Sequence, residues 1–180
     1  SDNQGPDVSR RAQRGGGGRR GRQRRQQQQH EELDKYPVLP PHAFARIVRD
    51  LRTLNIVYQV IEPPLTKKEE EVRSEIEAIF IQALTADIEE IDANPELYLR
   101  AAMDQIVKSY RLKVNKKSRS KIFYYLKRDL IGYGRMDVLM NDANVEDVSL
   151  DGTNIPIFAY HRKFESTETT IAWPDDQELE

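Results

Sequence analysis

The spacing of apolar residues changes partway along this chain, and that change constrains the fold more than any other feature. Between about residue 66 and residue 131, apolar side chains recur every three or four positions, which places them on one face of a helix. From Val145 onward they alternate with polar side chains, as they do in a strand with one buried face. The sequence therefore predicts an α+β domain, with a helical N-terminal part followed by a small antiparallel β-meander.

Three amphipathic helices are predicted in the helical part. Thr66 and Glu69 have the spacing of a capping box, so they begin a long helix. The apolar face of that helix is formed by Val72, Ile76, Ile79, Phe80, Ala83, Leu84 and Ile88. Asparagine followed by proline at 94–95 begins a second helix. A third is predicted from about Ser118 to Ile131, with Gly132 as its terminator, and the three apolar faces can bury a common core.

A shorter helix and a single strand are predicted upstream of these three. Structure is expected to begin near Pro41, after a proline-containing linker. The short helix has apolar residues at helical spacing, namely Phe44, Ile47, Val48 and Leu51. Residues 56–61 are rich in β-branched side chains and are followed by Pro63-Pro64, which indicates a strand that ends there.

The meander is predicted to contain three strands joined by tight turns. The strands are expected at Val145–Leu150, Ile155–Arg162 and Thr167–Trp173. Asp151-Gly152, with Thr153-Asn154, supplies the first turn. Residues 174–180 resemble the first turn of another helix, since proline and acidic residues favour a helix start. The folded domain should then cover 41–180, with its helical part at 41–135 and its meander at 145–173.

Residues 1–40 are expected to form a disordered tail and a proline linker. The first thirty residues hold eight of the 28 Lys+Arg and two of the 30 Asp+Glu, so this stretch carries +6 and the remainder −8. Its apolar content is too low to offset the entropy of ordering, and at most its Gln-rich end, residues 24–34, could form a frayed helix. Charge alone could attract nucleic acid, anionic lipid or an acidic protein, although a solvated tail is the simpler interpretation. The residues that would make such a polyanion contact are Arg19, Arg20, Arg22, Arg24 and Arg25.

Several classes of site are excluded by the residues themselves. The chain has no cysteine, so it has no disulfide, thiolate metal site or cysteine nucleophile. No run of about eighteen apolar residues is present, and the arginine-rich start lacks the apolar segment of a secretory signal, so we expect a soluble intracellular protein. No Gly-x-x-x-x-Gly-Lys-Ser/Thr phosphate loop occurs. The stretch 132–135, with two glycines and an arginine, fits a helix exit better than a phosphate loop.

Two groups of side chains could carry chemistry, but each has a simpler interpretation. Acidic residues cluster around the first meander strand, at Asp142, Glu146, Asp147 and Asp151. A solvated loop and strand face is favoured there over a metal site, because no histidine stands at ligand spacing. His161 and Arg162 are expected at the end of a surface strand. Arg162 could also bind phosphate or carboxylate through its planar fork of donors.

A block in the second half of the chain resembles a known family. The residues that carry the resemblance are Leu130–Asp142, Val145–Gly152, Ile155–Phe164 and, upstream, Tyr58–Leu65. Together they are similar to the N-terminal domain of archaeal type II/IV secretion ATPases, the type II secretion protein E family, which drives secretion systems, type IV pili and archaella. The resemblance covers about residues 55–180 and does not extend to the tail.

The resemblance implies what the intact protein would be. It would be a hexameric ATPase, cytoplasmic and peripheral at the inner face of the cell membrane, whose neighbouring subunits and a polytopic membrane platform protein are its partners. Its phosphate loop, ATP and Mg²⁺ sites and catalytic glutamate would lie beyond Glu180, so this fragment has no cofactor and no catalytic residue of its own. Arg162, with Arg135 and Lys163 as weaker candidates, would approach the nucleotide at the boundary between domains.

Two alternatives of a different class remain open at the level of sequence. The chain could be a nucleic-acid-binding module that uses its basic tail, or a small helical adaptor unrelated to any motor. No aromatic residue is interleaved with the tail arginines to stack on bases, so the tail lacks one component of single-strand recognition.

Overall fold

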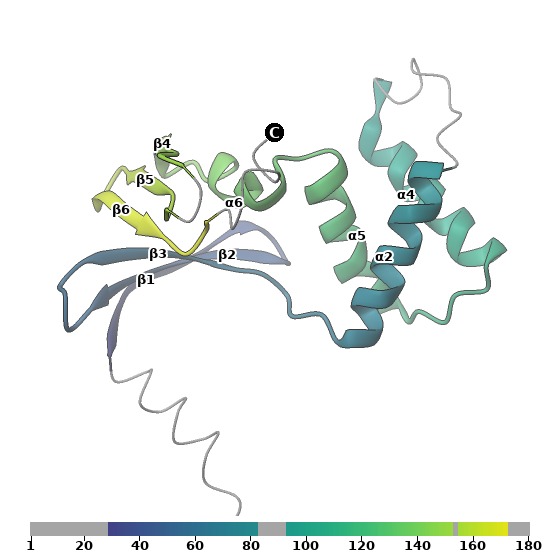
Figure 1. Cartoon of the computed structure of the whole chain (residues 1–180), viewed down its shortest axis with the longest axis horizontal. Helices are drawn as coiled ribbons and strands as arrows, with labels where there is room; N and C mark the ends of the chain where they lie inside the picture. Colours follow the sequence, from purple (N-terminus) through teal and green to yellow (C-terminus); the bar gives the residue numbers. More distant parts are fainter. Residues whose placement is uncertain (1–28, 83–92, 153–154, 173–180) are drawn as a thin grey trace, which may run out of the picture.

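The computed structural model describes residues 29–82, 93–152 and 155–172, which form an α+β domain in two parts. Figure 1 shows the sheet at one end of the molecule and three long helices at the other. The predicted fold class is confirmed. The helical part, expected at 41–135, is smaller than predicted, because three strands precede it. Of these only the strand at 56–61 was predicted, and the first long helix begins at Lys67, where the capping box places it.

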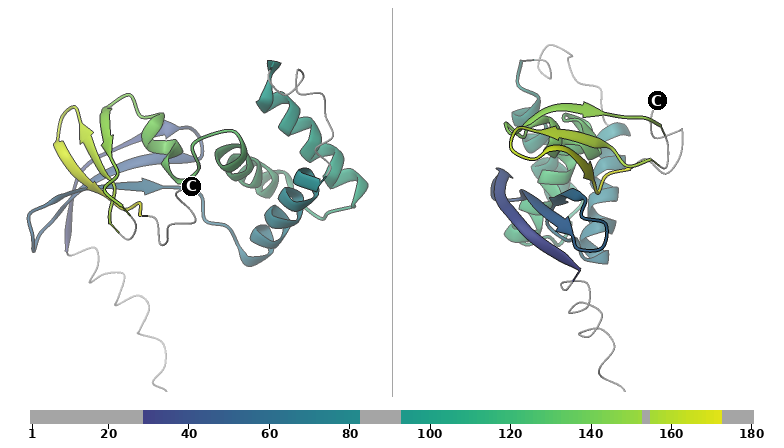
Figure 2. Two further views of the ribbon diagram at one scale, coloured as in Figure 1. Left: turned by 45° about the horizontal axis from the view of Figure 1, so that its top comes forward. Right: turned by 90° about the vertical axis from the view of Figure 1, so that its left-hand side faces the viewer.

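The six strands form one sheet in the order β1-β2-β3-β6-β5-β4. One antiparallel half contains β1 (His30–Leu39), β2 (Ala43–Asp50) and β3 (Ile56–Ile61). The other contains β4 (Val145–Ser149), β5 (Phe158–His161) and β6 (Glu165–Thr169). This second half confirms the predicted meander. A short parallel pairing of β3 with β6, at Tyr58 and Thr169, joins the halves, and Figure 2 shows them inclined toward each other.

The helix predicted at residues 44–51 is wrong, because this segment is strand β2. Ala43, Ala45 and Ile47 are fully buried at alternate positions, and Val48 next to Ile47 is fully buried as well. The alternating spacing is the period of a strand, and β2 pairs with both β1 and β3 along its length. The turn into β3 is fixed by Asp50, whose Oδ1 accepts hydrogen bonds from the backbone amides of Arg52 (2.7 Å) and Thr53 (3.1 Å).

Strand β1 corrects the expected boundary of the tail. Residues 30–39 are paired with β2, so the ordered domain begins well before residue 41, and the frayed helix predicted at 24–34 is wrong where the structure describes it. The residues of β1 that pack toward the core are Leu33, Tyr36 and Val38. Two irregularities in the β1–β2 register allow this uneven spacing. The disorder predicted for residues 1–28 lies outside the described residues.

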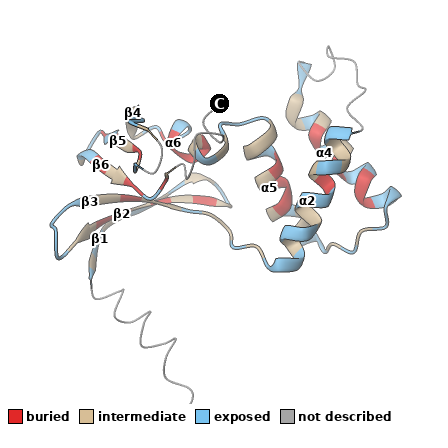
Figure 3. Ribbon diagram, viewed as in Figure 1, coloured by how far each residue is buried: buried red, intermediate tan, exposed pale blue. Residues whose placement is uncertain are grey.

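The core of the sheet part lies between the two inclined halves. Its buried members come from β2, β3, β5 and the segments around them: Ala45, Ile47, Tyr58, Leu139, Ile157, Ala159 and Ile171. Leu139 belongs to α6 (Asp137–Met140), a short helix that closes one side of this core. Figure 3 shows the buried residues gathered where the two halves of the sheet meet and along the inner faces of the helices.

Three long helices form the second part, as predicted. They are α2 (Lys67–Gln82), α4 (Pro95–Ser109) and α5 (Lys116–Leu130). The capping box is confirmed, since the Thr66 amide donates to Glu69 Oε2 (2.8 Å) and the Glu69 amide donates to Thr66 Oγ1 (3.2 Å). Asn94 caps α4 by accepting a hydrogen bond from the Leu97 amide (3.1 Å). The shared core contains Ile76, Leu99, Met103, Ile106, Val107, Ile122, Phe123 and Leu126.

Gly132 ends α5, as its position predicts. The amides of Ile131 and Gly132 both donate to the Lys127 carbonyl, at 3.0 and 2.9 Å. A Cβ at Gly132 would collide with the Asp137 carboxylate and would lie 2.9 Å from the Arg128 carbonyl oxygen. The chain can therefore turn directly from α5 into the 3₁₀ helix η1 (Gly134–Met136) and α6 only if this position has no side chain.

Some predictions concern residues that the structure does not describe. They are the end of the first helix face (Ala83, Leu84 and Ile88), the Thr153-Asn154 part of the turn, and the helical turn expected at 174–180.

Candidate functional site

The turn between β5 and β6 presents two of the three predicted nucleotide-contacting cations. The Arg162 side chain is 65 % exposed, and its Nε lies 3.1 Å from Glu146 Oε1. The Lys163 side chain is 66 % exposed, with its Nζ 3.7 Å from Asp34 Oδ2. Both ion pairs are solvated and therefore weak, so either cation can exchange its carboxylate for another anion.

Arg135 lies at the other end of β6. It follows α5 in η1, and its Nη1 lies 3.4 Å from the carbonyl oxygen of Ala172, which comes after β6. Arg162 precedes the same strand. Because an extended strand rises about 3.3 Å per residue, the structure brings Arg162 and Lys163 together and keeps Arg135 away from them.

A buried carboxylate stands beneath this turn. Asp142 is 5 % exposed and accepts three hydrogen bonds: from the Tyr36 hydroxyl (2.6 Å), the Tyr58 hydroxyl (2.6 Å) and the backbone amide of Asn144 (2.8 Å). Tyr36 comes from β1 and Tyr58 from β3, so one side chain after α6 ties two of the three strands of the first half to the start of the meander. Buried carboxylates are stable only with donors of this kind.

His161 extends this network to the turn. Its Nδ1 accepts hydrogen bonds from the backbone amides of Lys163 (3.1 Å) and Phe164 (3.3 Å). Its Nε2 lies 3.0 Å from the Tyr36 hydroxyl, whose proton is already donated to Asp142. The arrangement assigns the neutral tautomer with hydrogen on Nε2, because Nδ1 must accept and the Tyr36 oxygen can only accept. His161 thus fixes the backbone that carries Lys163.

The same contacts shift the pKa values of the network. Burial, and then the hydrogen bond to the Asp142 carboxylate, raise the pKa of both Tyr36 and Tyr58 well above the usual range for tyrosine. Burial lowers the pKa of His161, and the positive charges of Lys163 and Arg162 act in the same direction, whereas the charges of Asp142 and Asp34 oppose them. At neutral pH the tyrosines are therefore protonated donors and His161 is uncharged.

Two interpretations made from sequence are corrected here. Asp142 is not part of a solvated acidic face, because it is buried and accepts three hydrogen bonds. His161 ends strand β5 before a turn, as expected, but it is 2 % exposed and therefore does not lie on the surface. Glu146, Asp147 and Asp151 are exposed, as expected. Within the residues that the structure describes, no group of three or more His, Cys, Asp or Glu side chains is arranged to hold a metal ion.

A second polar cluster joins the sheet part to the helical part. Arg128 of α5 donates to both carboxylate oxygens of Glu62, just after β3, at 2.9 Å each, and its Nε donates to Asp129 (2.6 Å). The Tyr124 hydroxyl also donates to Glu62 (2.7 Å). Burial opposes the charge of Arg128, but the Asp129 hydrogen bond and the Glu62 charge raise its pKa overall. This cluster couples the orientation of α5 to the end of β3.

A groove of about 1110 Å³ lies beside this junction, between α4, α5 and the turn from β1 to β2. Its charged walls are largely neutralised by their own ion pairs, such as Lys127 Nζ with Glu96 Oε2 at 2.6 Å and Arg119 Nη1 with Asp104 Oδ1 at 3.2 Å. The groove contains no glycine-rich phosphate loop. The predicted nucleotide-contacting cations Arg162 and Lys163 lie outside this groove, on the β5–β6 turn.

Comparison with known proteins places similar sequences in an archaeon. The chain is 38 % identical over 124 residues to the uncharacterized protein MJ1288 of Methanocaldococcus jannaschii. This match covers 68 % of this chain and 49 % of that protein. It is 35 % identical over 69 residues to MJ0900, covering 38 % of this chain and 12 % of that protein. It is 42 % identical over 50 residues to MJ0781, and this match covers 27 % of this chain and 6 % of that protein. Both are uncharacterized proteins of the same organism. No protein-family model matches the sequence.

The chain therefore spans about half of the first relative and small parts of the other two. In the described part of this chain, no helix combines the length and the apolar character that crossing a membrane requires. The five tail arginines proposed for polyanion contact lie outside the described residues.

Proposed function

We propose that this chain is the N-terminal interface domain of a larger secretion, pilus or archaellum assembly ATPase. The described residues of the block that resembles that family, 130–152 and 155–164, run from the end of α5 through η1, α6 and β4 to the β5–β6 turn. Matches to small parts of two longer archaeal proteins support a domain that occurs within larger chains.

The observation that carries this proposal is the exposed Arg162 on a turn held from below by a buried network. Nδ1 of the neighbouring His161 accepts from two backbone amides of the turn, and the Arg162 amide donates to the Asn144 carbonyl (2.8 Å). A turn fixed in this way can hold a guanidinium in one place while its side chain stays accessible. The phosphates of a nucleotide can replace Glu146, because that ion pair is exposed at both ends.

In this proposal the domain itself performs no hydrolysis. ATP and Mg²⁺ bind to a nucleotide core that follows Glu180 in the intact protein, and Arg162 stabilises charge that develops on the transferred phosphoryl group. The Glu62–Arg128 cluster then transmits a displacement of the sheet to α5 and its neighbours. The remaining surfaces contact adjacent subunits of a hexamer and a membrane platform protein at the cytoplasmic face of the membrane.

A direct test compares ATP hydrolysis by this chain of 180 residues with hydrolysis by a longer polypeptide that continues beyond Glu180. The expected result is Mg²⁺-dependent turnover by the longer protein alone, because the shorter chain has no phosphate loop. Metal-dependent hydrolysis by the shorter chain, or none by the longer one, would contradict the proposal.

The basic tail provides the main competing function, and it can be tested separately. RNA and DNA are titrated into the full chain and into a variant without residues 1–30, each at two salt concentrations. Weak binding that disappears with the tail and with added salt is the behaviour of solvated arginines. Tight binding that survives the deletion would favour a nucleic-acid-binding module instead.

A further inference from the structure

A second basic surface, distinct from the tail, lies where α4 turns into α5. Between positions 108 and 121 the chain has seven Lys or Arg residues and no Asp or Glu, although residues 31–180 as a whole carry −8. We call this set the α4–α5 basic surface. It comprises Lys108, Arg111, Lys113, Lys116, Lys117, Arg119 and Lys121. Such a local excess of positive charge on an acidic body is not a general consequence of composition.

Most of this charge is unneutralised within the described part of the protein. Arg119 pairs with Asp104 (3.2 Å), and Lys121 pairs with Glu69 (2.7 Å). The other five side chains are exposed, and none of them forms an ion pair with a described residue. Cations gathered on one surface with few opposite charges beside them produce a positive potential there, which attracts anions.

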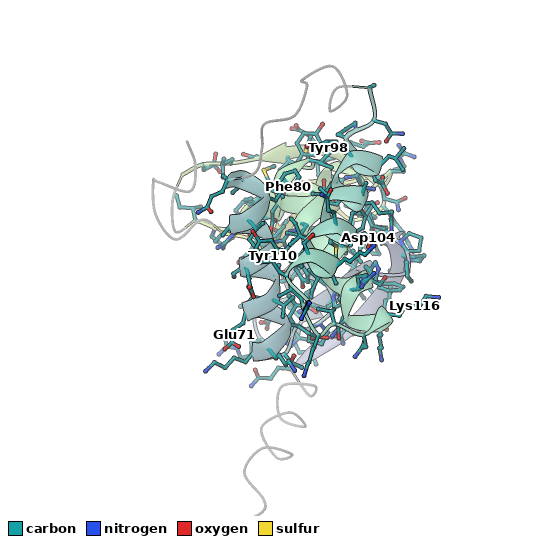
Figure 4. The ribbon with its side chains drawn as sticks, turned by 90° about the vertical axis from the view of Figure 1, so that its right-hand side faces the viewer. Glu71, Phe80, Tyr98, Asp104, Tyr110 and Lys116 are labelled. Atoms are coloured by element: carbon teal, nitrogen blue, oxygen red, sulfur yellow. The ribbon has the colours of Figure 1, made fainter. Side chains whose placement is uncertain are left out.

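The backbone of this segment holds the cations outward. Leu112 and Val114 pack against the helical core, whereas Arg111 and Lys113 between them are exposed. The Leu112 amide donates to the Val107 carbonyl (3.0 Å), and Asn115 caps α5. Figure 4 views the molecule from this end, where Tyr110 and Lys116 are labelled. The apolar side chains thus anchor the loop and leave its charged side chains in solvent.

From these observations we propose that the α4–α5 basic surface binds the headgroups of an anionic lipid bilayer. Clusters of four to eight basic residues attract anionic membranes, each contributing about 1 kcal/mol near the surface. Five of the seven cations are lysines, which are compact and strongly hydrated and suit attachment by charge without fixed geometry. Tyr110, 56 % exposed, has the apolar ring and polar tip that favour the headgroup region.

The geometry favours a bilayer over nucleic acid. Single strands bind in a basic groove with several aromatic side chains for stacking, whereas this surface is a turn between helices with one exposed aromatic residue. The turn is also at the opposite end of the molecule from the point where the tail enters β1 (Figure 1). A contact made here therefore needs no residue of the tail.

This inference adds a lipid-facing surface to the proposed membrane-associated motor and rests on that function only for its biological setting. The charges that carry it belong to the described residues and need no nucleotide core. A vesicle-binding assay can therefore fail while ATP hydrolysis by the longer protein succeeds, and the reverse is equally informative.

The test measures binding of the full chain to vesicles by co-sedimentation. Vesicles of equal parts phosphatidylglycerol and phosphatidylcholine are compared with vesicles of phosphatidylcholine alone, at low and at physiological ionic strength. The variant K116E/K117E reverses two charges in the first turn of α5, where glutamate is favourable for the helix. The matched control K35E/R52E makes the same charge change on exposed residues of the sheet part.

Binding of the unchanged chain is expected only to the anionic vesicles and to weaken with salt. K116E/K117E should bind at least about thirtyfold more weakly, since each basic residue near the surface contributes roughly fivefold, whereas K35E/R52E and the charge-preserving K116R/K117R should bind as the unchanged chain does. The proposal would be overturned if K116E/K117E and K35E/R52E lost vesicle binding equally, or if K116E/K117E lost none. Binding of the unchanged chain to an RNA oligonucleotide but not to vesicles would also overturn it. If the circular dichroism shows that K116E/K117E has lost its helices, K116Q/K117Q, which removes the same two positive charges, takes its place and the same outcomes decide.

Discussion

Removing the Asp142 carboxylate should be one of the most damaging single changes to the described part of the protein. The side chain is 5 % exposed and accepts hydrogen bonds from Tyr36, Tyr58 and the Asn144 amide, at 2.6, 2.6 and 2.8 Å. A hydrogen bond to a charged group contributes about 1.5–3 kcal/mol. In Asp142→Ala the hydroxyl of Tyr58, a fully buried residue, cannot regain a water partner, whereas the half-buried Tyr36 and Asn144 regain one in part. The free energy of unfolding should therefore fall by about 3–4 kcal/mol.

The assay is urea unfolding of the full chain followed by far-ultraviolet circular dichroism, with Tyr58→Phe and the double variant completing a cycle. Tyr58→Phe alone should cost about 2 kcal/mol. In the Asp142→Ala background it should cost nothing or restore some stability, because it removes a buried hydroxyl that no longer has its acceptor, which gives a coupling energy of at least about 2 kcal/mol.

Glu146→Ala is the matched control, since this nearby carboxylate is 46 % exposed and its pairing with Arg162 is solvated. Its effect should stay within about 0.5 kcal/mol. The hydrogen bonds assigned to Asp142 would be refuted if Asp142→Ala cost no more stability than Glu146→Ala. Additive effects of Asp142→Ala and Tyr58→Phe would refute the Tyr58 hydrogen bond in particular.

Three further predictions concern the turn, the junction and the helix exit. The pKa of His161 is lowered from 6.5 by burial, so the unfolded chain binds more protons in the acid range, and stability should be complete above about pH 6.5 and fall as pH decreases from there. Burial also lowers the pKa of His42, which acts in the same direction. His161→Gln should therefore reduce but not abolish the pH dependence of the melting temperature. An unchanged pH dependence would contradict the buried, uncharged state of His161. Arg128→Ala should cost about 2–3 kcal/mol, because it leaves the Glu62 carboxylate without its principal donor, and Arg52→Ala in the exposed β2–β3 turn should be near neutral in the same urea titration. Gly132→Ala should lower the melting temperature by several degrees, at about 2–4 °C per kcal/mol, because its Cβ meets the carboxylate of the buried Asp137; an unchanged melting temperature would mean that the exit from α5 is not closely packed.

The helices were predictable because their signals are local. Thr66 and Glu69 lie three residues apart, and Asn94 directly precedes the proline that begins α4. Strand β2 was not predictable in this way, because its apolar residues fit a helical spacing as well as an alternating one. What decides between them is pairing with β1 and β3, which no short window contains.

The supporting network was unpredictable for the same reason. Tyr36 and Asp142 are 106 residues apart in sequence, and Tyr58 and Asp142 are 84 apart, so nothing near Asp142 distinguishes it from the exposed acids that follow it. The α4–α5 basic surface, in contrast, is visible as a local excess of charge between residues 108 and 121. A search for uninterrupted runs of one charge sign would have found it.

The measurement that tests the central claim most directly is ATP turnover by the longer protein carrying Arg162→Ala. With Arg162 over the phosphates, kcat should fall at least about a hundredfold and Arg162→Lys should recover only part of it, because a cation near the transferred phosphoryl group acts mainly on the transition state. The circular dichroism of the variant should be unchanged, since the side chain is 65 % exposed. A kcat within about twofold of the unchanged protein would remove Arg162 from the nucleotide site and contradict the proposed role of the turn.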